Sequence, residues 1–421
     1  QTSLHRHPWS IGGGGAAELK ELLDERGEKT LGEVVEAIGR TTVVGEDDVW
    51  ISDSSSAKRL RVATWSIPFV IGENVRDWQL DSSLCAIYPY VSLGGPPVSG
   101  KTSLVQHYLW PFRVLLQHRT VFGKTFEDSG RPWWEHLEHY TDKLRTPLSI
   151  AFAFVATHNH FVLDRGGKVF NRTAPVIKLR PDATEDDHLA LLGLLNSSTA
   201  CFWMKQAFFH RGNGGIGGGI ANEEWEHFFE HDGTKLSAYP IVGQAVNEHR
   251  LARDLDTTGR LLAEWSDKAP HSREENDAAA ERAARALASM ISLQEELDWA
   301  VYRAYGLLAG DLTYAGAEPP PLKLGERAFE IVMARRVAAG ELETTWFERH
   351  GSTPITELPA HWPDDYRRLG ERRIALIESD RTIALIEQPE YKRRWNVEPF
   401  TEQQERALRT WLRDRLEDPR Y

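Results

Sequence analysis

Apolar residues recur with a helical period near both ends of the chain, whereas the middle consists of short β-type runs. Helical spacing predicts short helices over residues 16–23 and 31–38. Between residues 41 and 180, turn residues separate the β-type runs, which predicts a strand-rich, mixed region. The expected strands cover residues 42–44, 49–52, 61–70, 85–91, 120–122, 150–156, 160–163 and 174–179, and helices are expected at 109–118 and 132–144.

The second half of the chain carries helix-start signals ahead of apolar periodicities. A Ser or Thr precedes an acid or amide at the spacing of a capping box in three places: Thr184 with Asp187, Ser272 with Glu275, and Thr401 with Gln404. Asn196-Ser197-Ser198 ends the first of these helices and caps another that reaches residue 209. Residues 240–310 are predicted to be helical around a polar break. Beyond Pro319-Pro320-Pro321, helices are expected near 326–339, 364–386 and 402–417.

These patterns predict an α+β fold in four parts. The parts are a helical entry segment at 1–40, a strand-rich domain at 41–240, a helical spacer at 241–318 and a mainly helical domain at 319–421.

The amino-acid composition excludes several classes of protein. The 421 residues are 41% hydrophobic and 27% charged, which is ordinary for a globular protein. Two cysteines, Cys85 and Cys201, exclude a disulfide scaffold and a four-thiolate zinc site. No run approaches the roughly 18 apolar residues of a membrane span. The chain begins at Gln1 without a signal-peptide pattern, so we interpret it as a cytoplasmic piece of a longer protein.

Charge is distributed unevenly along the chain. The net charge is −12, which argues against indiscriminate nucleic-acid binding. Residues 51–180 nevertheless sum to +6, against −5 before them, −6 over 181–250 and −7 over 251–421. This positive region is also rich in aromatic residues, Asn and His, which is a weak indication of nucleic-acid contact.

One segment matches the phosphate-binding P-loop pattern letter for letter. In Gly95-Pro96-Pro97-Val98-Ser99-Gly100-Lys101-Thr102, backbone amides would hold phosphates, the lysine would reach the β- and γ-phosphates, and the hydroxyl would bind magnesium. However, Pro111 interrupts the following helical pattern, and no strand–helix–strand alternation follows. Nucleotide hydrolysis is therefore the least favoured function, and a Gly-Pro loop with one exposed lysine is the simpler interpretation.

Thr157-His158-Asn159-His160 places two histidines on one face of a strand, where they could begin a metal site. Only Asp164 is near enough in sequence to be a third ligand. Hydrogen bonding to a polar partner, base edges included, and a structural role are the alternatives.

Catalytic motifs are missing from the sequence. We find no G-x-S-x-G motif and no paired Cys and His signature. The chain also lacks the N-P-P-[YF] tetrapeptide and the glycine-rich loop that an amino-methyltransferase needs for its target base and methyl donor. The sequence therefore predicts no catalytic centre in this chain.

Several phrases together resemble one protein family. They are His7-Pro8-Trp9-Ser10, residues 45–49, 72–78, 109–113, 133–135, VATHNHFVLDRGGK at 155–168, LLGLLNSSTACFWMK at 191–205, residues 297–302 and YKRRW at 391–395. They are similar to the C-terminal part of the PglX family, the adenine-specific DNA methyltransferases of phage-growth-limitation and bacteriophage-exclusion (BREX) systems. The phrases at 191–205 and 297–302 are also similar to type IIG restriction–modification enzymes.

The resemblance implies that this chain recognises target DNA. In that family the methyltransferase domain lies N-terminal to this region, uses S-adenosylmethionine and methylates an adenine flipped out of duplex DNA in the bacterial cytoplasm. The expected partners are double-stranded DNA, that methyltransferase domain and other phage-defence proteins, with no membrane. No cofactor is expected in this chain. Residues 41–240 would be the target-recognition domain.

Basic and amide side chains of the strand-rich domain are the candidates for DNA contact, because Arg and Lys suit phosphates and guanine and Asn suits adenine. The glycine-rich loop at 212–219 could enter a groove. The alternatives are a protein-interaction scaffold of the defence complex and the P-loop NTPase. The candidate DNA-binding residues are Arg76, Lys101, Arg113, Arg119, Lys124, His158, Asn159, His160, Arg165, Lys168, Arg172, Lys178, Arg211 and Asn213.

Overall fold

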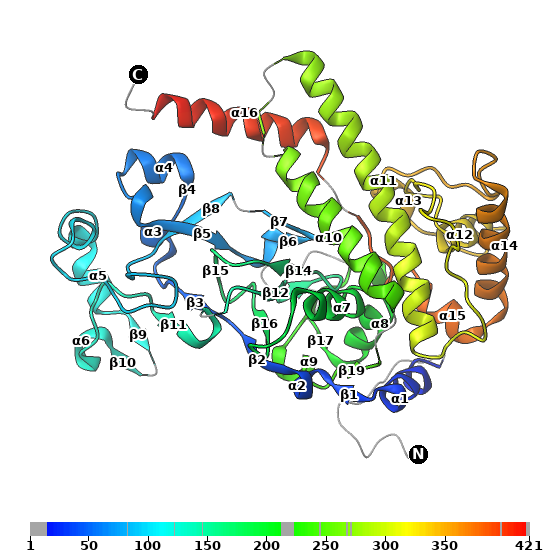
Figure 1. The fold of residues 1–421 in the computed structure, drawn as a ribbon, viewed down its shortest axis with the longest axis horizontal. Coiled ribbons are helices and arrows are strands. Elements are labelled where there is room, and N and C mark those ends of the chain that lie inside the picture. The colour runs from blue at the N-terminus through cyan, green and yellow to red at the C-terminus, as the bar shows by residue number, and fades with distance from the viewer. Residues whose placement is uncertain are drawn as a thin grey trace.

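The computed structural model confirms a mixed α+β fold (Figure 1). It describes residues 15–81, 83–121, 123–144, 146–211, 223–243, 246–266, 268–269, 272–395 and 398–417. Strands and short helices occupy the left and centre of Figure 1, and long helices lie above and to the right. Within these ranges, no helix is both long and apolar enough to cross a membrane.

Two four-stranded sheets form the strand-rich half. The central sheet has the order β14-β12-β16-β2 and is antiparallel throughout. The other sheet has the order β15-β5-β8-β4, and only its β15–β5 pair is parallel. The strands are β14 (Phe161–Asp164), β12 (Ser149–Phe152), β16 (Val176–Leu179) and β2 (Val35–Gly39), then β15 (Val169–Phe170), β5 (Ser66–Val70), β8 (Leu84–Ile87) and β4 (Ile51–Asp53).

Besides the two sheets there are short strand pairs, of which the first two named here join segments distant in sequence and the last two join neighbouring segments. The pairs are β1 (Lys29–Thr30) with β19 (Pro240–Ile241), β3 (Thr42–Val43) with β11 (Glu138–His139), β6 (Val75–Arg76) with β7 (Gln79–Leu80), and β9 (Thr120–Val121) with β10 (Lys124–Thr125). In addition, β18 (Phe229–Glu230) lies between β13 (Val155–Ala156) and β17 (Phe209–His210).

Helices cover the central sheet and build the remaining half. The long helices α10 and α11 pack against each other, and α10 also packs on α7. The longer helices are α1 (Ala16–Arg26), α7 (Glu185–Leu195), α8 (Ser198–Ala207), α10 (Val246–Ser266), α11 (Arg273–Ala304), α12 (Ala328–Ala338), α14 (Asp364–Ser379) and α16 (Phe400–Leu416). The short ones are α2 (Leu31–Val34), α3 (Asp47–Trp50), α4 (Ser54–Arg59), α5 (Arg113–Gln117), α6 (Phe126–Ser129), α9 (Gly233–Leu236), α13 (Trp346–Arg349) and α15 (Arg381–Ile386).

Buried side chains fall into two main cores. One core draws its residues from Val44 to Phe69 and from Ala86 to Leu144, with Val169 added; we call residues 44–69 and 86–144 the tip lobe. The larger core runs from Ala16 to Trp395 and joins the central sheet to the helices. That larger core is continuous across residue 240, so a domain boundary there stays a prediction.

Two of the helix predictions are wrong. The predicted helix at 31–38 ends after Val34, because the next residues pair with β16 as the edge strand β2. The predicted helix at 132–144 is a series of turns around β11. There the carbonyls of Trp133 and Glu135 accept hydrogen bonds from the Arg119 guanidinium, instead of from backbone amides of a helix. Long-range pairing overrides local spacing in both places.

Two of the three expected capping boxes are present as helix caps. The Thr184 hydroxyl accepts a hydrogen bond from the Asp187 amide at the start of α7, and the Ser272 hydroxyl accepts one from the Glu275 amide at the start of α11. Ser197 caps α8 as predicted. The third is wrong, because α16 begins at Phe400 after Pro399, which places Thr401 inside the first turn.

Candidate nucleic-acid interface

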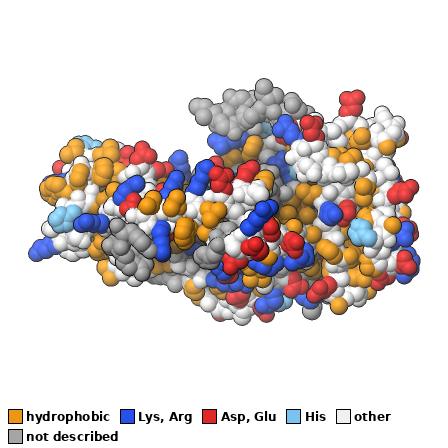
Figure 2. Space-filling model, turned by 90° about the horizontal axis from the view of Figure 1, so that it is seen from above, with side chains coloured by type: hydrophobic (Ala, Val, Ile, Leu, Met, Phe, Trp, Pro, Cys, Tyr) orange, Lys and Arg blue, Asp and Glu red, His pale blue; other side chains and the backbone are white. Residues whose placement is uncertain are grey.

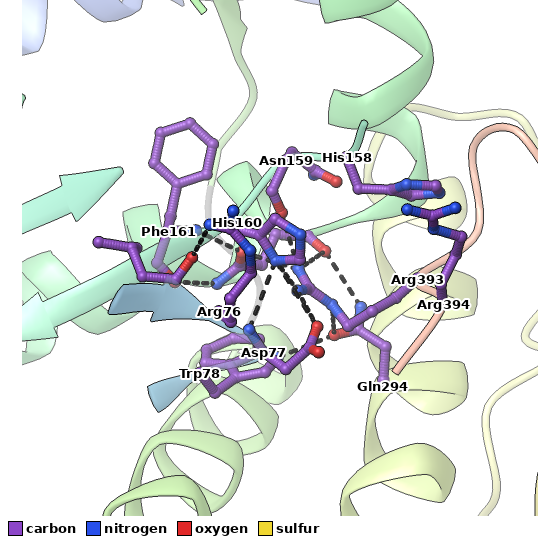
Figure 3. A network of polar contacts seen from close by, with 12 residues as sticks. Arg76, Asp77, Trp78, His158, Asn159, His160, Phe161, Gln294, Arg393 and Arg394 are labelled. Carbon is purple, nitrogen blue, oxygen red and sulfur yellow. Dashed lines mark hydrogen bonds and ion pairs between the residues drawn. The ribbon is translucent and has the colours of Figure 1, made fainter. Parts of the chain in front are cut away.

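Three of the phrases that carry the family resemblance converge on one buried side chain of a fourth phrase, Arg393 (Figure 3). The turn at 72–78, the loop at 157–160, the break between α7 and α8, and helix α11 all approach it. These segments lie up to 316 positions from Arg393 in the sequence. These phrases therefore meet where the strand-rich half joins the helices.

The Arg393 guanidinium is fully engaged by the protein. Nη1 lies 3.0 Å from an Asp77 carboxylate oxygen, and Nη2 donates to the Asn159 carbonyl at 3.0 Å. Nη2 also reaches Asn196 Oδ1 at 2.9 Å, and Nε reaches Gln294 Oε1 at 3.2 Å. This arrangement matches the planar fork of arginine, which can serve several acceptors at once.

The three candidates of the 157–160 loop also turn inward. The Asn159 amide donates to the carbonyls of Leu195 and Ser197, at 2.7 and 2.9 Å. His160 Nδ1 accepts from the Asp77 backbone amide and from Arg393, and burial keeps the pKa of His160 well below its usual value. His158 is buried, and its pKa is lowered in the same way. The 157–160 loop, with its two histidines uncharged, is thus part of the core. Among the described residues, no metal-ligand cluster includes this loop.

Buried histidines make the stability of the fold dependent on pH. Burial lowers the pKa of His136 and of His231 to about 3. In the unfolded chain both have a pKa of about 6.5, so the unfolded state takes up protons first as the pH falls. We therefore expect the free energy of unfolding to be constant above about pH 7.5 and to decrease as the pH falls below about 6.5.

Denaturant unfolding at about pH 8, 6.5 and 5 measures this dependence. His136→Gln should weaken it, whereas His118→Gln, at an exposed site, should leave it unchanged. A stability that stays level or rises between about pH 6.5 and 5 would contradict the expectation.

Three further candidates direct their donors into the protein. Arg119 is buried in the tip lobe and donates to the carbonyls of Val44, Leu116, Trp133 and Glu135. Lys178 is buried under the carbonyls of Thr146 and Leu148, and burial lowers its pKa to about 8. Arg76 is half-buried and donates to two carbonyls of its own turn.

Three other candidates are held by carboxylates. Arg165 bridges Glu185 on α7 and Asp256 on α10, each at 2.7 Å. Lys168 pairs with Asp164 at 2.7 Å, and Arg211 lies 3.4 Å from Glu230. A phosphate would have to displace these carboxylates.

Four candidates are exposed cations, and within the described ranges none of them forms an ion pair with a carboxylate: Lys101, Arg113, Lys124 and Arg172. The first three lie on the tip lobe, and Arg172 lies in the turn between β15 and β16. Asn213 and the glycine-rich loop at 212–219 lie outside the described residues.

The P-loop pattern has no P-loop geometry around it. Strand β8 ends at Ile87, well before Gly95, and is antiparallel to both of its neighbours. Gly100 lies against the Trp134 ring, where a Cβ would be 2.8 Å from the nearest ring carbon. The segment is a packed turn, with Lys101 exposed as the simpler interpretation expected.

Comparisons with known proteins confirm the resemblance. Residues 290–421 match a family described only as a domain of unknown function, DUF7008. The adenine-specific methyltransferase PglX of Streptomyces coelicolor is 42% identical over 430 residues, covering 98% of this chain and 35% of that protein. The chain thus spans about a third of the length of the curated relative it matches.

Among solved structures, a type IIL restriction-modification enzyme, MmeI, in complex with DNA aligns with 68% of this chain and 34% of its own, at 12% identity and a TM-score of 0.39. That score is too low to establish a shared fold. Over nearly its whole length, the chain is similar to one part of the adenine-specific methyltransferase PglX.

Proposed function

We propose that this chain recognises a short sequence in duplex DNA and presents one adenine to a methyltransferase domain outside these 421 residues. The observation that carries the proposal is the 42% identity to PglX over nearly the whole chain. The chain itself has no N-P-P-[YF] tetrapeptide, so its part in the reaction is recognition. The adjoining domain would bind S-adenosylmethionine and transfer its methyl group to the flipped adenine. In a bacterial cytoplasm, that mark would separate host DNA from phage DNA.

The proposed DNA-facing cations are Lys101, Arg113, Lys124 and Arg172. They are exposed and, within the described residues, outside ion pairs, so a phosphate can approach them without displacing a carboxylate. The net charge of −12 does not oppose this, because local charge governs phosphate contact. Phosphate contacts would orient the chain, while a few side chains would read bases.

Selection from a randomised duplex pool at several salt concentrations tests the proposal. We expect one short site to be enriched, with log K falling by about 0.9 per contacted phosphate for each tenfold rise in salt. The assay is run on this chain and on the full-length protein that contains it. Absence of duplex binding by both would leave the protein-interaction scaffold as the function.

Neutralising the four proposed cations should weaken binding to all duplexes alike. Glutamine at Lys101, Arg113, Lys124 and Arg172 should lower the slope of log K against log salt by about 0.9 for each cation that contacts a phosphate. The matched control is Arg285→Gln, since Arg285 is exposed on α11 and paired with Glu281. An unchanged salt slope in the fourfold variant would contradict this assignment of the DNA face.

A further inference from the structure

The tip lobe carries a run of helical turns with one buried apolar face and one exposed apolar face. A π-helical turn at Leu104–Leu109 and a 3-10 turn at Trp110–Phe112 lead into α5. The inward side chains Leu104, Leu109 and Leu116 are buried in the lobe core.

On the outward face, Trp110, Val114 and Leu115 are 54%, 67% and 47% exposed, and we call these three side chains the tip ridge. Trp110 and Val114 are four positions apart, which places them on one face of the helical run. In Figure 2, hydrophobic side chains lie beside Lys, Arg and His at the left end of the molecule, the end that carries α5 in Figure 1.

The Trp110 ring is supported from beneath. It meets the edge of Trp133 at a centroid distance of 6.3 Å, and Trp133 packs on Trp134 at 5.5 Å. Trp134 in turn donates its indole N–H to the Val98 carbonyl. The Arg113 guanidinium lies 5.0 Å from the Trp110 ring centroid. The exposed ring is therefore held in place by a series of packed aromatic side chains.

The sequence around the tip ridge contains no acid. Residues 82–126 have no Asp or Glu, although they include Lys101, Arg113, Arg119 and Lys124. Carboxylates return on α6 as Glu127 and Asp128, and Asp128 is already held by the Thr125 hydroxyl at 2.6 Å. An exposed apolar ridge with Arg113 against its tryptophan, on a stretch of sequence without carboxylates, complements a nucleic-acid groove, whose walls are phosphates and whose base steps are apolar.

We propose that the tip ridge inserts into a groove of duplex DNA and unstacks one base step, while Arg113, Lys101 and Lys124 contact the flanking phosphates. This inference rests on the proposed function and adds a mode of DNA deformation to it. An aromatic wedge can replace part of the stacking that a base step loses, and the resulting bend makes a site easier to open. The ridge would thus help to expose an adenine without contacting it.

The test uses duplexes that carry the enriched site, with single 2-aminopurines at successive positions except the target adenine. Binding of the wild-type chain, or of the full-length protein if only that binds, should raise 2-aminopurine fluorescence at one step. Trp110→Ala should abolish that rise and lower duplex affinity roughly 10-fold, and Trp110→Phe should retain most of both. The matched control is Trp411→Ala, because Trp411 is 46% exposed on α16 with Arg415 6.0 Å from its ring.

The outcomes separate this inference from the proposed function. If the wild-type protein binds the duplex but no position brightens, or if Trp110→Ala binds and brightens as the wild type does, the wedge is overturned and recognition of DNA stands. The ridge would then serve a protein partner. If neither preparation binds any duplex, the proposed function fails and the wedge fails with it.

Discussion

Lys392→Met is expected to lower the free energy of unfolding by about 3–5 kcal/mol. The Lys392 ammonium is completely buried and lies 2.8 Å from Asp298, 3.0 Å from Glu387 and 3.2 Å from Glu295. These three carboxyl groups are at most 2% exposed. Without the lysine, three acidic groups share one low-dielectric site and lose the cation that pairs with all of them. Chemical denaturation at neutral pH measures the loss.

The loss at Lys392 should itself depend on pH. Burial already raises the pKa of Glu295 to about 7 while the lysine is present. In Lys392→Met the carboxyl groups can become neutral by binding protons, so the destabilisation should shrink as the pH falls toward about 5. Lys20→Met is the matched control, because Lys20 is mostly buried and, among the described residues, its one ion pair is with the half-exposed Asp24. That control should cost less than about 1 kcal/mol, and equal losses in the two variants would contradict the argument.

Arg393→Met is expected to cost about 3 kcal/mol or more, and it should loosen the contact between the strand-rich half and the helices. The substitution leaves Asp77 as a buried carboxylate without its partner and deprives the Asn159 carbonyl of a donor. Denaturant unfolding gives the loss, and hydrogen exchange at 72–78 and 157–160 shows where it falls. We expect faster exchange in both segments.

Arg393→Lys distinguishes the charge from the shape of the side chain. Lysine keeps the positive charge but cannot serve Asp77, Asn196 and Gln294 together, because its donors radiate from a single nitrogen. An intermediate loss is therefore expected. If Arg393→Lys were as stable as the wild type, the charge alone would suffice and the multiple hydrogen bonds would be unimportant.

Local sequence signals correctly predicted the helix starts that depend on hydrogen bonds between neighbouring residues. The caps at Thr184, Ser197 and Ser272 were predictable because each accepts a hydrogen bond from the amide three residues away. The α+β class followed from the change of hydrophobic period along the chain. The segments at 31–38 and 132–144 were not predictable, because pairing with β16 and with β3 decides their conformation from far away in the sequence.

The candidate site was predictable only in part. Fourteen residues have side chains suited to DNA contact, and their types do not reveal whether they face outward. Only the packing places Arg119, Asn159 and Lys178 under backbone carbonyls and leaves Lys101, Arg113 and Lys124 in solvent. The tip ridge was missed altogether, although the absence of acids from residues 82–126 was a readable signal.

By itself, the sequence determined the fold class, the main helix starts and the relationship to PglX, because periodicity, caps and shared phrases are properties of neighbouring residues. The tertiary structure alone decided which of the candidate cations are exposed and which stabilise the core through hydrogen bonds. A guanidinium can donate to a phosphate, a carboxylate or a carbonyl. Which of these it meets depends on acceptors that the fold brings from elsewhere in the chain, 75 positions away for Arg119 and Val44 and 91 for Arg165 and Asp256.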